Sequence, residues 1–289
     1  MKILVIGDPI IDQFTFVNIN RMSPEDNSVP ILDIQNTSTR LGAALNVACN
    51  LKSLNPENDI FVAAPMSGWT IAELIFRNIG NAVEQFTDEA WEPSRDELIK
   101  ERFIDAKTNK QIVRTDNRLK FSDKIIKKFK KAFSHIIIED FDCIVVSDYN
   151  KGCIDWSVVN KLKGIGCSIF VDTKQQDLST WKDLGNVIVK INWKEFEQAK
   201  HVEQIRDLVV THGEKPVQLR KNNQLVKEFV VRPVENPDVC GAGDVFLSGL
   251  VVEYLKSQDL DKSIKFAICV AEKSIEKQGT CVVNEDEMK

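Results

Sequence analysis

The chain has 289 residues, and its 38 lysines and arginines against 43 aspartates and glutamates give a formal net charge of −5. Apolar residues make up 43% and charged residues 28%, a balance typical of globular proteins that excludes an intrinsically disordered, collagen-like or disulfide-scaffold chain. The length allows about two domains or a single large α/β unit.

Neither the amino-terminal segment nor the cysteines point to secretion or to a membrane. Only Ile3 to Gly7 separate Lys2 from the acidic Asp8, so a signal-peptide apolar region cannot form. No apolar run approaches the roughly 18 residues that a membrane-spanning helix needs. Seven scattered cysteines without a C-x-x-C pair, and three isolated histidines, match neither a disulfide framework nor a metal site. We therefore expect a cytoplasmic protein with reduced thiols and no membrane partner.

Short apolar runs alternate with helical patterns along most of the chain. Strands are predicted at Ile3–Ile6, Ile60–Ala64, Cys143–Val146, Ser168–Val171, Val187–Ile191 and Val217–Leu219. Helices are predicted at Ala43–Leu54, Thr70–Asn78, Ser122–Ser134, Ser157–Gly164, Lys194–Ala199, Gly241–Lys256 and Leu260–Gln278. This alternation predicts an α/β fold with a central, mostly parallel sheet flanked by helices.

Two segments, residues 13–40 and 99–115, interrupt this alternation. The second contains Arg102–Asp105 and Gln111–Arg114 on either side of a turn at Lys107–Lys110. We expect both segments to form antiparallel strands outside the main sheet, as a small lid. Exposed lid strands commonly pair with another chain, so a homodimer through the lid is a further hypothesis.

A cluster of lysines marks the helix predicted at Ser122–Ser134. Ile126, Phe129 and Phe133 recur among these lysines at helical spacing, which is typical of an amphipathic helix with a solvated face. No zinc-finger spacing or aromatic RNA-binding motif occurs, and the acidic balance provides no broad field for phosphates. We expect no nucleic acid partner.

The strongest local motif is Asp238–Asp244, with the sequence D-V-C-G-A-G-D, which runs into a helical pattern. If Gly241, Ala242 and Gly243 lie at the start of that helix, their unpaired amides and the helix dipole form an anion hole. Asp244 beside it could accept a proton from an attacking hydroxyl while the amides stabilise a transferring phosphoryl group. The alternative is an aspartate that merely favours the first turn of a helix. Neither a complete dinucleotide-binding fingerprint nor a Walker A loop is present.

Further motifs follow one another along nearly the whole chain: Gly7-Asp8 with Asp12, Arg21–Glu25 (R-x-S-P-E), Leu41–Ala48, Lys100–Arg102, Ser147–Gly152 (S-D-Y-x-K-G), Asp172–Lys174, Asn192–Glu195 and Lys277–Thr280. Together with the G-A-G-D motif they resemble the ribokinase/PfkB carbohydrate kinase family. Within it they are most similar to the D-glycero-β-D-manno-heptose-7-phosphate kinases, the kinase part of the enzymes that make ADP-heptose for lipopolysaccharide.

The resemblance implies a ribokinase-like fold and an ATP-dependent sugar kinase. The implied acceptor is the anomeric hydroxyl of a heptose 7-phosphate, and the implied product is the 1,7-bisphosphate. Because the motifs run from Gly7 to Thr280, we expect residues 1–289 to form a single kinase domain. No C-terminal nucleotidyltransferase domain is expected.

The resemblance also implies roles for individual residues. Asp244 would be the catalytic base beside the anion hole. The implied substrate-binding residues are Asp8, Asp12, Arg21, Gly42, Asn46, Lys100, Arg102, Lys151 and Lys174. Without the resemblance, the acids would be ordinary turn residues and each cation a surface charge.

A separate set of residues is implied in nucleotide binding: Asn192, Trp193, Lys194, Glu195, Thr211, Gly213 and Gly279. Asn192 and Glu195 resemble the pair that arranges Mg²⁺ through water molecules. A helix N-cap followed by an acidic third residue gives the same N-x-x-E pattern. The expected cofactors are ATP and Mg²⁺, and the need for a monovalent cation is left open.

Several positions depart from the family pattern. Ala43 and Gln175 replace glycines, Cys240 replaces a threonine, and Trp69 stands in a turn that lacks the usual acidic residue. Two alternatives therefore stay open: another PfkB-type sugar or nucleoside kinase, and a catalytically idle sugar- or nucleotide-binding protein of the same fold. The R-x-S-P-E and S-D-Y-x-K-G motifs argue against the first, and the intact Asp244 argues against the second.

Overall fold

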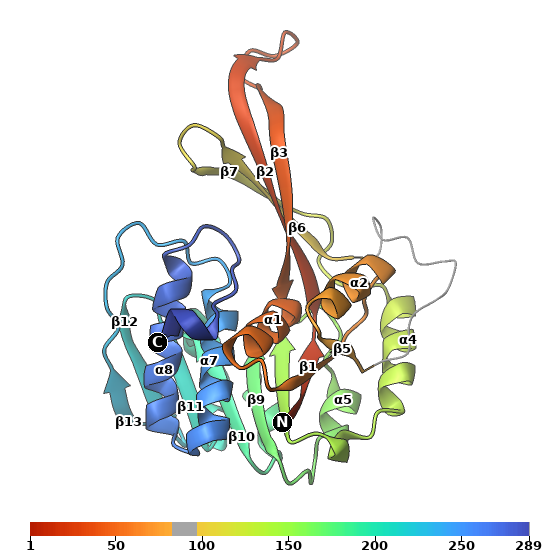
Figure 1. Ribbon diagram of the computed structural model, residues 1–289, viewed down its shortest axis with the longest axis vertical. Coiled ribbons are helices and arrows are strands. Elements are labelled where there is room, and N and C mark those ends of the chain that lie inside the picture. Colours follow the sequence, from red (N-terminus) through yellow and green to blue (C-terminus); the bar gives the residue numbers. More distant parts are fainter. Residues whose placement is uncertain (83–96, 289) are drawn as a thin grey trace.

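The computed structural model describes residues 1–82 and 97–288. They form a nine-stranded main sheet with helices on both faces, and a separate four-stranded sheet that projects from one end of it (Figure 1). The predicted α/β class, with a mostly parallel central sheet and a second, small sheet, is confirmed.

The main sheet has the strand order β13-β12-β11-β10-β9-β8-β1-β4-β5. Its strands are β1 (Lys2–Gly7), β4 (Asp59–Ala63), β5 (Gly80–Asn81), β8 (Cys143–Asp148), β9 (Ser168–Thr173), β10 (Val187–Asn192), β11 (Asp207–His212), β12 (Lys215–Lys221) and β13 (Gln224–Phe229). Each pair of neighbouring strands from β5 to β11 is parallel. In contrast, β12 pairs antiparallel with β11, and β13 pairs antiparallel with β12. The strand predicted at Val217–Leu219 therefore lies in an antiparallel edge, because a tight turn at Gly213, with φ 58°, reverses the chain.

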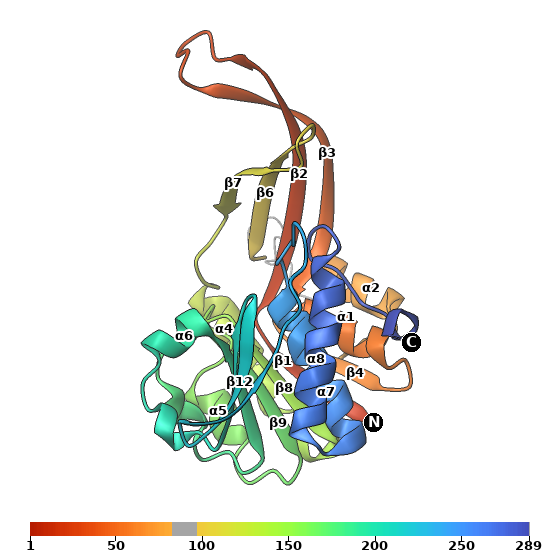
Figure 2. The ribbon, with the colours of Figure 1, turned by 90° about the vertical axis from the view of Figure 1, so that its left-hand side faces the viewer.

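Helices cover both faces of this sheet (Figure 2). One face carries α1 (Ala44–Leu54), α2 (Gly68–Phe76), α7 (Ala242–Ser257) and α8 (Leu260–Ile275). The other carries α4 (Asp123–Ser134), α5 (Trp156–Lys161) and α6 (Trp193–Gln198). Short 3-10 helices lie at Ile138–Asp140, Leu178–Trp181, Val202–Gln204 and Glu285–Met288. Side chains of β1 alternate between the two hydrophobic cores, with Ile3 and Val5 in one and Leu4 and Ile6 in the other.

The second sheet has the order β3-β2-β6-β7, formed by β2 (Pro9–Met22), β3 (Pro30–Ala43), β6 (Ile99–Asp105) and β7 (Gln111–Asp116). Both interrupting segments thus contain strands outside the main sheet. The expectation of purely antiparallel pairing is wrong for β2 and β6, which run parallel. The chain between them passes through the main unit, and such a crossover connection allows parallel pairing. The β2–β3 hairpin is buried at its base and exposed at its far end.

The amphipathic helix predicted around the lysine cluster is α4. Its buried residues are Ile125, Phe129 and Phe133, whereas Ile126 is only half-buried. The seven cysteines are free. No helix of the described residues is long and apolar enough to cross a membrane.

Candidate active site

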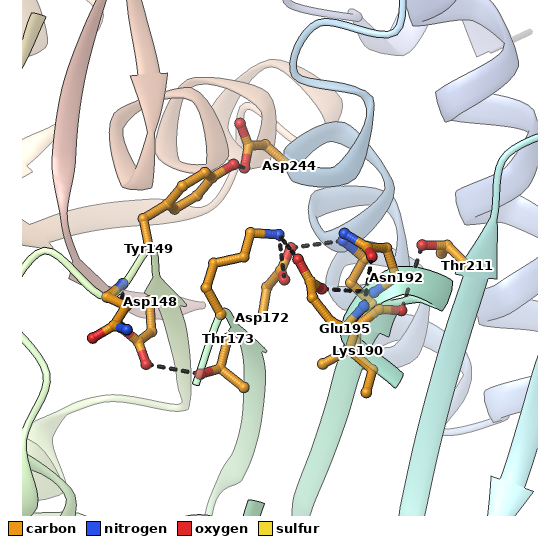
Figure 3. A network of polar contacts seen from close by, with 12 residues as sticks. Asp148, Tyr149, Asp172, Thr173, Lys190, Asn192, Glu195, Thr211 and Asp244 are labelled. Atoms are coloured by element: carbon orange, nitrogen blue, oxygen red, sulfur yellow. Dashed lines mark hydrogen bonds and ion pairs between the residues drawn. The ribbon is translucent and has the colours of Figure 1, made fainter. Parts of the chain in front are cut away.

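Loops from several strands meet the start of α7 at the carboxyl edge of the main sheet (Figure 3). Parallel strands bring the loops that follow them to the same edge, where α/β proteins commonly form binding sites. Tyr149 follows β8, Asp172 lies near the end of β9, and Lys190 lies near the end of β10. These side chains surround Asp244.

Asp244 lies in the first turn of α7 and is 2% exposed. Its Oδ1 accepts a hydrogen bond from the Tyr149 hydroxyl at 2.8 Å, and its Oδ2 accepts one from the Asn46 amide at 3.1 Å. Burial raises the pKa of Asp244 to about 6, although these two hydrogen bonds act in the opposite direction. The carboxylate is therefore mostly ionised at pH 7 and retains lone pairs for a further donor.

Two glycines allow α7 to begin close to its neighbours. Gly241 has φ 76°, a left-handed conformation that favours glycine, and a Cβ there would lie 2.8 Å from Asn46 Nδ2. A Cβ on Gly243 would lie 2.9 Å from Lys190 Nζ. The helix start is therefore packed directly against an amide and an ammonium group.

The amides at this helix start differ in their partners. The N–H of Ala242 donates to the Val239 carbonyl at 3.3 Å. For the amides of Gly241 and Gly243, the described part of the chain shows no acceptor. Two of the three amides of the predicted anion hole are therefore available to an anion.

A buried ion pair lies beside the start of α7. Lys190 and Asp172 are 2% and 3% exposed, and Lys190 Nζ lies 2.7 Å from Asp172 Oδ2. The other oxygen, Oδ1, is buried and has no hydrogen-bond partner among the described residues. Lys174 extends the network, with Nζ 3.9 Å from that oxygen and 2.5 Å from Glu195 Oε1. The sequence did not predict Lys190 as a site residue, although a lysine inside the apolar run Val187–Ile191 was an available signal.

The base of the second sheet provides another polar cluster. Asp12 Oδ1 and Arg102 form an ion pair at 2.6 Å, and the Thr280 hydroxyl donates to Asp12 Oδ2 at 2.8 Å. A Cβ on Gly42 would meet Asp12 Oδ2 at 2.3 Å, so a larger residue would displace this carboxylate. Asp12, Gly42 and Arg102, which were predicted together, lie together here.

Tyr149 joins the two clusters, although it had no predicted role. Its ring lies 4.9 Å from Lys100 Nζ of β6 and 5.2 Å from Lys174 Nζ, and its hydroxyl reaches Asp244. Burial lowers the pKa of Lys100, partly offset by the charges of nearby acids. The only sequence signal for Tyr149 was its place in the S-D-Y-x-K-G motif.

Asp8 and Lys151 lie side by side, but backbone groups occupy the carboxylate. Asp8 Oδ2 accepts hydrogen bonds from the amides of Tyr149 at 2.8 Å and Lys151 at 3.0 Å, and Oδ1 accepts one from Cys153 at 3.2 Å. Burial raises the pKa of Asp8 despite these bonds. In this structure Asp8 holds the loop that carries Tyr149, whereas Asp12 faces Arg102.

Arg21 is not brought to this site. It lies at the far end of β2 with its side chain 68% exposed, 3.7 Å from Asp33 across the hairpin. The structure gathers most of the other predicted substrate-binding residues at the hairpin base and sheet edge: Asp12, Gly42, Asn46, Lys100, Arg102 and Lys174.

The predicted nucleotide-binding residues lie around the ends of β10 and β11. Asn192 and Thr211 are register partners on these parallel strands. The Trp193 ring stacks on His212 with centroids 4.4 Å apart, a contact that the sequence did not predict. Lys194 is exposed.

The C-terminal loop is tied to both halves of the site. The amide of Gly279 donates to Asp238 Oδ2 at 2.7 Å. Arg40 of β3 donates to the carbonyls of Gln278 at 2.8 Å and Thr280 at 2.7 Å. Gly279 is thus near the G-A-G-D loop, as its predicted role requires.

Asn192 and Glu195 form a helix-capping box in this structure. Asn192 Oδ1 accepts from the Glu195 amide at 3.0 Å, and Glu195 Oε2 accepts from the Asn192 amide at 2.8 Å. Among residues 1–82 and 97–288, no three histidine, cysteine or acidic side chains gather as metal ligands. Mg²⁺ commonly keeps several waters, so Glu195 and Asp172 Oδ1, which has no hydrogen-bond partner among the described residues, fit this ion through water molecules.

Comparison with known proteins shows what the chain is similar to. Residues 168–287, which include the start of α7 and the network around Asp172, match the family described as pfkB family carbohydrate kinase. This match and the similarity to known kinases described next support a phosphotransferase with an alcohol group as acceptor. The fold is similar to that of Escherichia coli phosphofructokinase-2 in complex with potassium, with TM-score 0.74 at 15% identity over 100% of this chain and 96% of that one. Ribokinase from Thermotoga maritima gives TM-score 0.71 at 17% identity over 99% and 97%.

Curated relatives match over nearly the whole chain. The "Bifunctional protein HldE" of Helicobacter acinonychis (strain Sheeba) is 29% identical over 313 residues, covering 99% of this chain and 65% of the relative. The protein of the same name from Helicobacter pylori (strain HPAG1) is 30% identical, with the same coverage. The chain thus spans 65% of the length of these relatives, slightly less than two thirds.

The departures from the PfkB pattern have different surroundings. Gln175 Nε2 donates to Asp148 Oδ2 at 2.7 Å, and burial raises the pKa of Asp148 to about 6. Cys240 Sγ lies 3.3 Å from the Thr280 hydroxyl, within the cluster around Asp12. Ala43 ends β3 with φ 53°, and the Trp69 side chain is exposed.

Proposed function

We propose that this PfkB protein is an ATP-dependent kinase that phosphorylates the anomeric hydroxyl of D-glycero-D-manno-heptose 7-phosphate. The observation that carries the proposal is the buried Asp244 carboxylate at the start of α7, with each oxygen held by one donor and a buried lysine beside the helix start. This arrangement combines a base with groups that stabilise a phosphoryl anion.

In the proposed reaction, Asp244 takes the proton of the acceptor hydroxyl while the oxygen of that hydroxyl forms a bond to the γ-phosphorus of ATP. The bond from this phosphorus to the β,γ-bridging oxygen breaks, and ADP leaves. The amides of Gly241 and Gly243 and the Lys190 ammonium stabilise the charge on the transferring group. Glu195 and Asp172 would hold Mg²⁺ through water, and the ion supplies charge neutralisation at the phosphates.

The substrate assignment rests on the cations at the base of the second sheet and on the motifs that resemble those of the heptose-7-phosphate kinases. Lys100 and Arg102 extend from β6 toward the site, and a sugar phosphate needs cations remote from its reacting hydroxyl. We propose that the second sheet acts as a lid that excludes water from the reaction. Exposed apolar side chains at its outer part, such as Ile34 and Val29, support a homodimer through the lid.

The test is sugar-dependent ADP release with purified protein, MgATP and a panel of sugars. Selective release with heptose 7-phosphate, and a ³¹P spectrum of an anomeric phosphate, would support the proposal. Faster release with fructose 6-phosphate, ribose or a nucleoside would indicate another PfkB-type kinase. ATP binding without ADP release for any sugar would indicate a binding protein. Repeating the assay with added potassium or sodium tests the need for a monovalent cation.

A further inference from the structure

The Tyr149 side chain contacts the proposed base, the second sheet and the buried cation network. Its hydroxyl lies 2.8 Å from Asp244 Oδ1 (Figure 3). Lys100 of β6 and Lys174 after β9 lie near its ring at 4.9 and 5.2 Å, where the negative face of an aromatic ring attracts cations. A residue with these contacts can affect the proton affinity of the base without touching the substrate.

We propose that Tyr149 is a positioning residue that keeps Asp244 ionised and correctly oriented for proton transfer. The phenol donates a hydrogen bond to a carboxylate that is otherwise buried, and such a bond stabilises the charged form of the acid. Asn46 holds the other carboxylate oxygen, so the two donors together fix the plane of the carboxyl group.

The phenol is suited to act only as a donor. Burial raises the pKa of Tyr149 well above its ordinary value, and the negative charges of Asp244 and Asp172 act in the same direction. The hydroxyl therefore stays protonated over the pH range in which Asp244 titrates. The loop position is also fixed, since the Tyr149 amide donates to the buried Asp8 at 2.8 Å.

The groups that bear on the charge of Asp244 come from six elements or loops. They are Asn46 of α1, Lys100 of β6, Tyr149 after β8, Asp172 of β9, Lys174 after β9 and Lys190 of β10. Of these, Tyr149 and Asn46 donate directly to the carboxylate. Tyr149→Phe removes one of these hydrogen bonds and retains the ring that the lysines contact.

The kinetic test compares Tyr149→Phe with Tyr254→Phe, which removes the other tyrosine hydroxyl of the chain, on a ring packed against Phe170. In Tyr149→Phe, the acid limb of the kcat/KM profile should move up by about one to two pH units, the size expected for the loss of a hydrogen bond to a carboxylate. Activity should fall about two- to tenfold at pH 7 and recover near pH 9. Tyr254→Phe should match the wild type at every pH. An equal loss at all pH values in Tyr149→Phe, or no loss, would overturn the inference.

A second measurement is independent of turnover, because the kinetic test rests on the proposed kinase function. In Tyr254→Phe protein grown with 3-fluorotyrosine, Tyr149 is the single labelled residue. Its ¹⁹F signal should titrate with one inflection near pH 6, and the inflection should vanish in Asp244→Asn. A flat signal would contradict the inference even if the kinase is active. A titrating signal in a protein inactive toward every sugar would instead contradict the proposed function.

Discussion

Arg102 at the base of the second sheet and Arg21 at its outer end were both predicted to bind substrate, but they lie in different environments. At the base, the Arg102 side chain is 14% exposed and lies 2.6 Å from Asp12. At the outer end, the Arg21 side chain is 68% exposed and lies 3.7 Å from Asp33. Water screens the second pair far more than the first, so only the base pair can hold a substrate group with a fixed geometry. Motif membership alone does not distinguish these two arginines.

The same contrast separates the enclosed site beneath the second sheet from the exposed faces of the protein. In the enclosed site a carboxylate is held by a phenol and an amide, and a lysine is paired out of water. Changes there should therefore have large effects, and matched changes at exposed positions should have small ones.

The largest expected effect is on turnover in Asp244→Asn. The asparagine cannot accept the proton of the acceptor hydroxyl, so kcat should fall by about a thousandfold or more, while nucleotide binding by calorimetry should persist. Asp261→Asn is the matched control, since Asp261 also lies in the first turn of a helix, α8. If both variants have the kcat of the wild type, Asp244 is not the catalytic base and only stabilises the first turn of its helix.

The next effect concerns the buried ion pair. Lys190→Met removes the nearest cation from the buried Asp172 and leaves only Lys174, at 3.9 Å, so the free energy of unfolding in urea should fall by about 3–5 kcal/mol. Lys194→Met changes an exposed lysine of the following helix and should stay within about 0.5 kcal/mol of the wild type. Adding Asp172→Asn to Lys190→Met should restore part of the loss. An unchanged stability in Lys190→Met would show that the pair is not enclosed in solution.

A smaller effect should appear in the pH dependence of stability. Because the folded pKa of Asp244 is about 6 against 3.8 for an unperturbed aspartate, the folded state binds more protons than the unfolded chain between these values. The free energy of unfolding should therefore fall as pH rises through this window, by about 3 kcal/mol from this residue. Asp244→Asn should be more stable than the wild type at pH 7, and the difference should shrink toward pH 4. The measurement is thermal unfolding of both proteins across this pH range. The same pH dependence of stability in Asp244→Asn and in the wild type would contradict the expectation.

The smallest effects test the two arginines directly. Arg102→Gln should raise the KM for the sugar phosphate about tenfold, because it removes a cation and unpairs Asp12. Arg21→Gln should change the KM less than about twofold, since an exposed charge contributes little. An equal rise of the KM in both variants would show that Arg21 also contacts the substrate in the active protein. The proposed difference between the base and the outer end of the sheet would then be wrong.

The sequence by itself determined the fold class and most of the parallel core. Apolar runs such as Ile3–Ile6 and Cys143–Val146 became adjacent strands, because a strand buried on both faces needs a continuous apolar stretch. The edge strand β13 was not predicted, since its residues are mostly exposed and lack this signal. The parallel pairing of β2 with β6 was missed because it joins segments that are distant in the sequence.

For the candidate site, the sequence indicated the groups whose chemistry depends on neighbours along the chain. The start of α7 is of this kind, because Gly241 and Gly243 shape the turn that presents Asp244. Tertiary structure alone decided that Tyr149, 95 residues before Asp244, donates to it, and that Asn46, 198 residues before it, holds the other oxygen. It also separated Asp8, which holds a loop, from Asp12, which faces Arg102. The physical reason is that hydrogen bonds and ion pairs depend on distances between atoms in space. Residue type and local spacing do not determine these distances for residues far apart in the sequence.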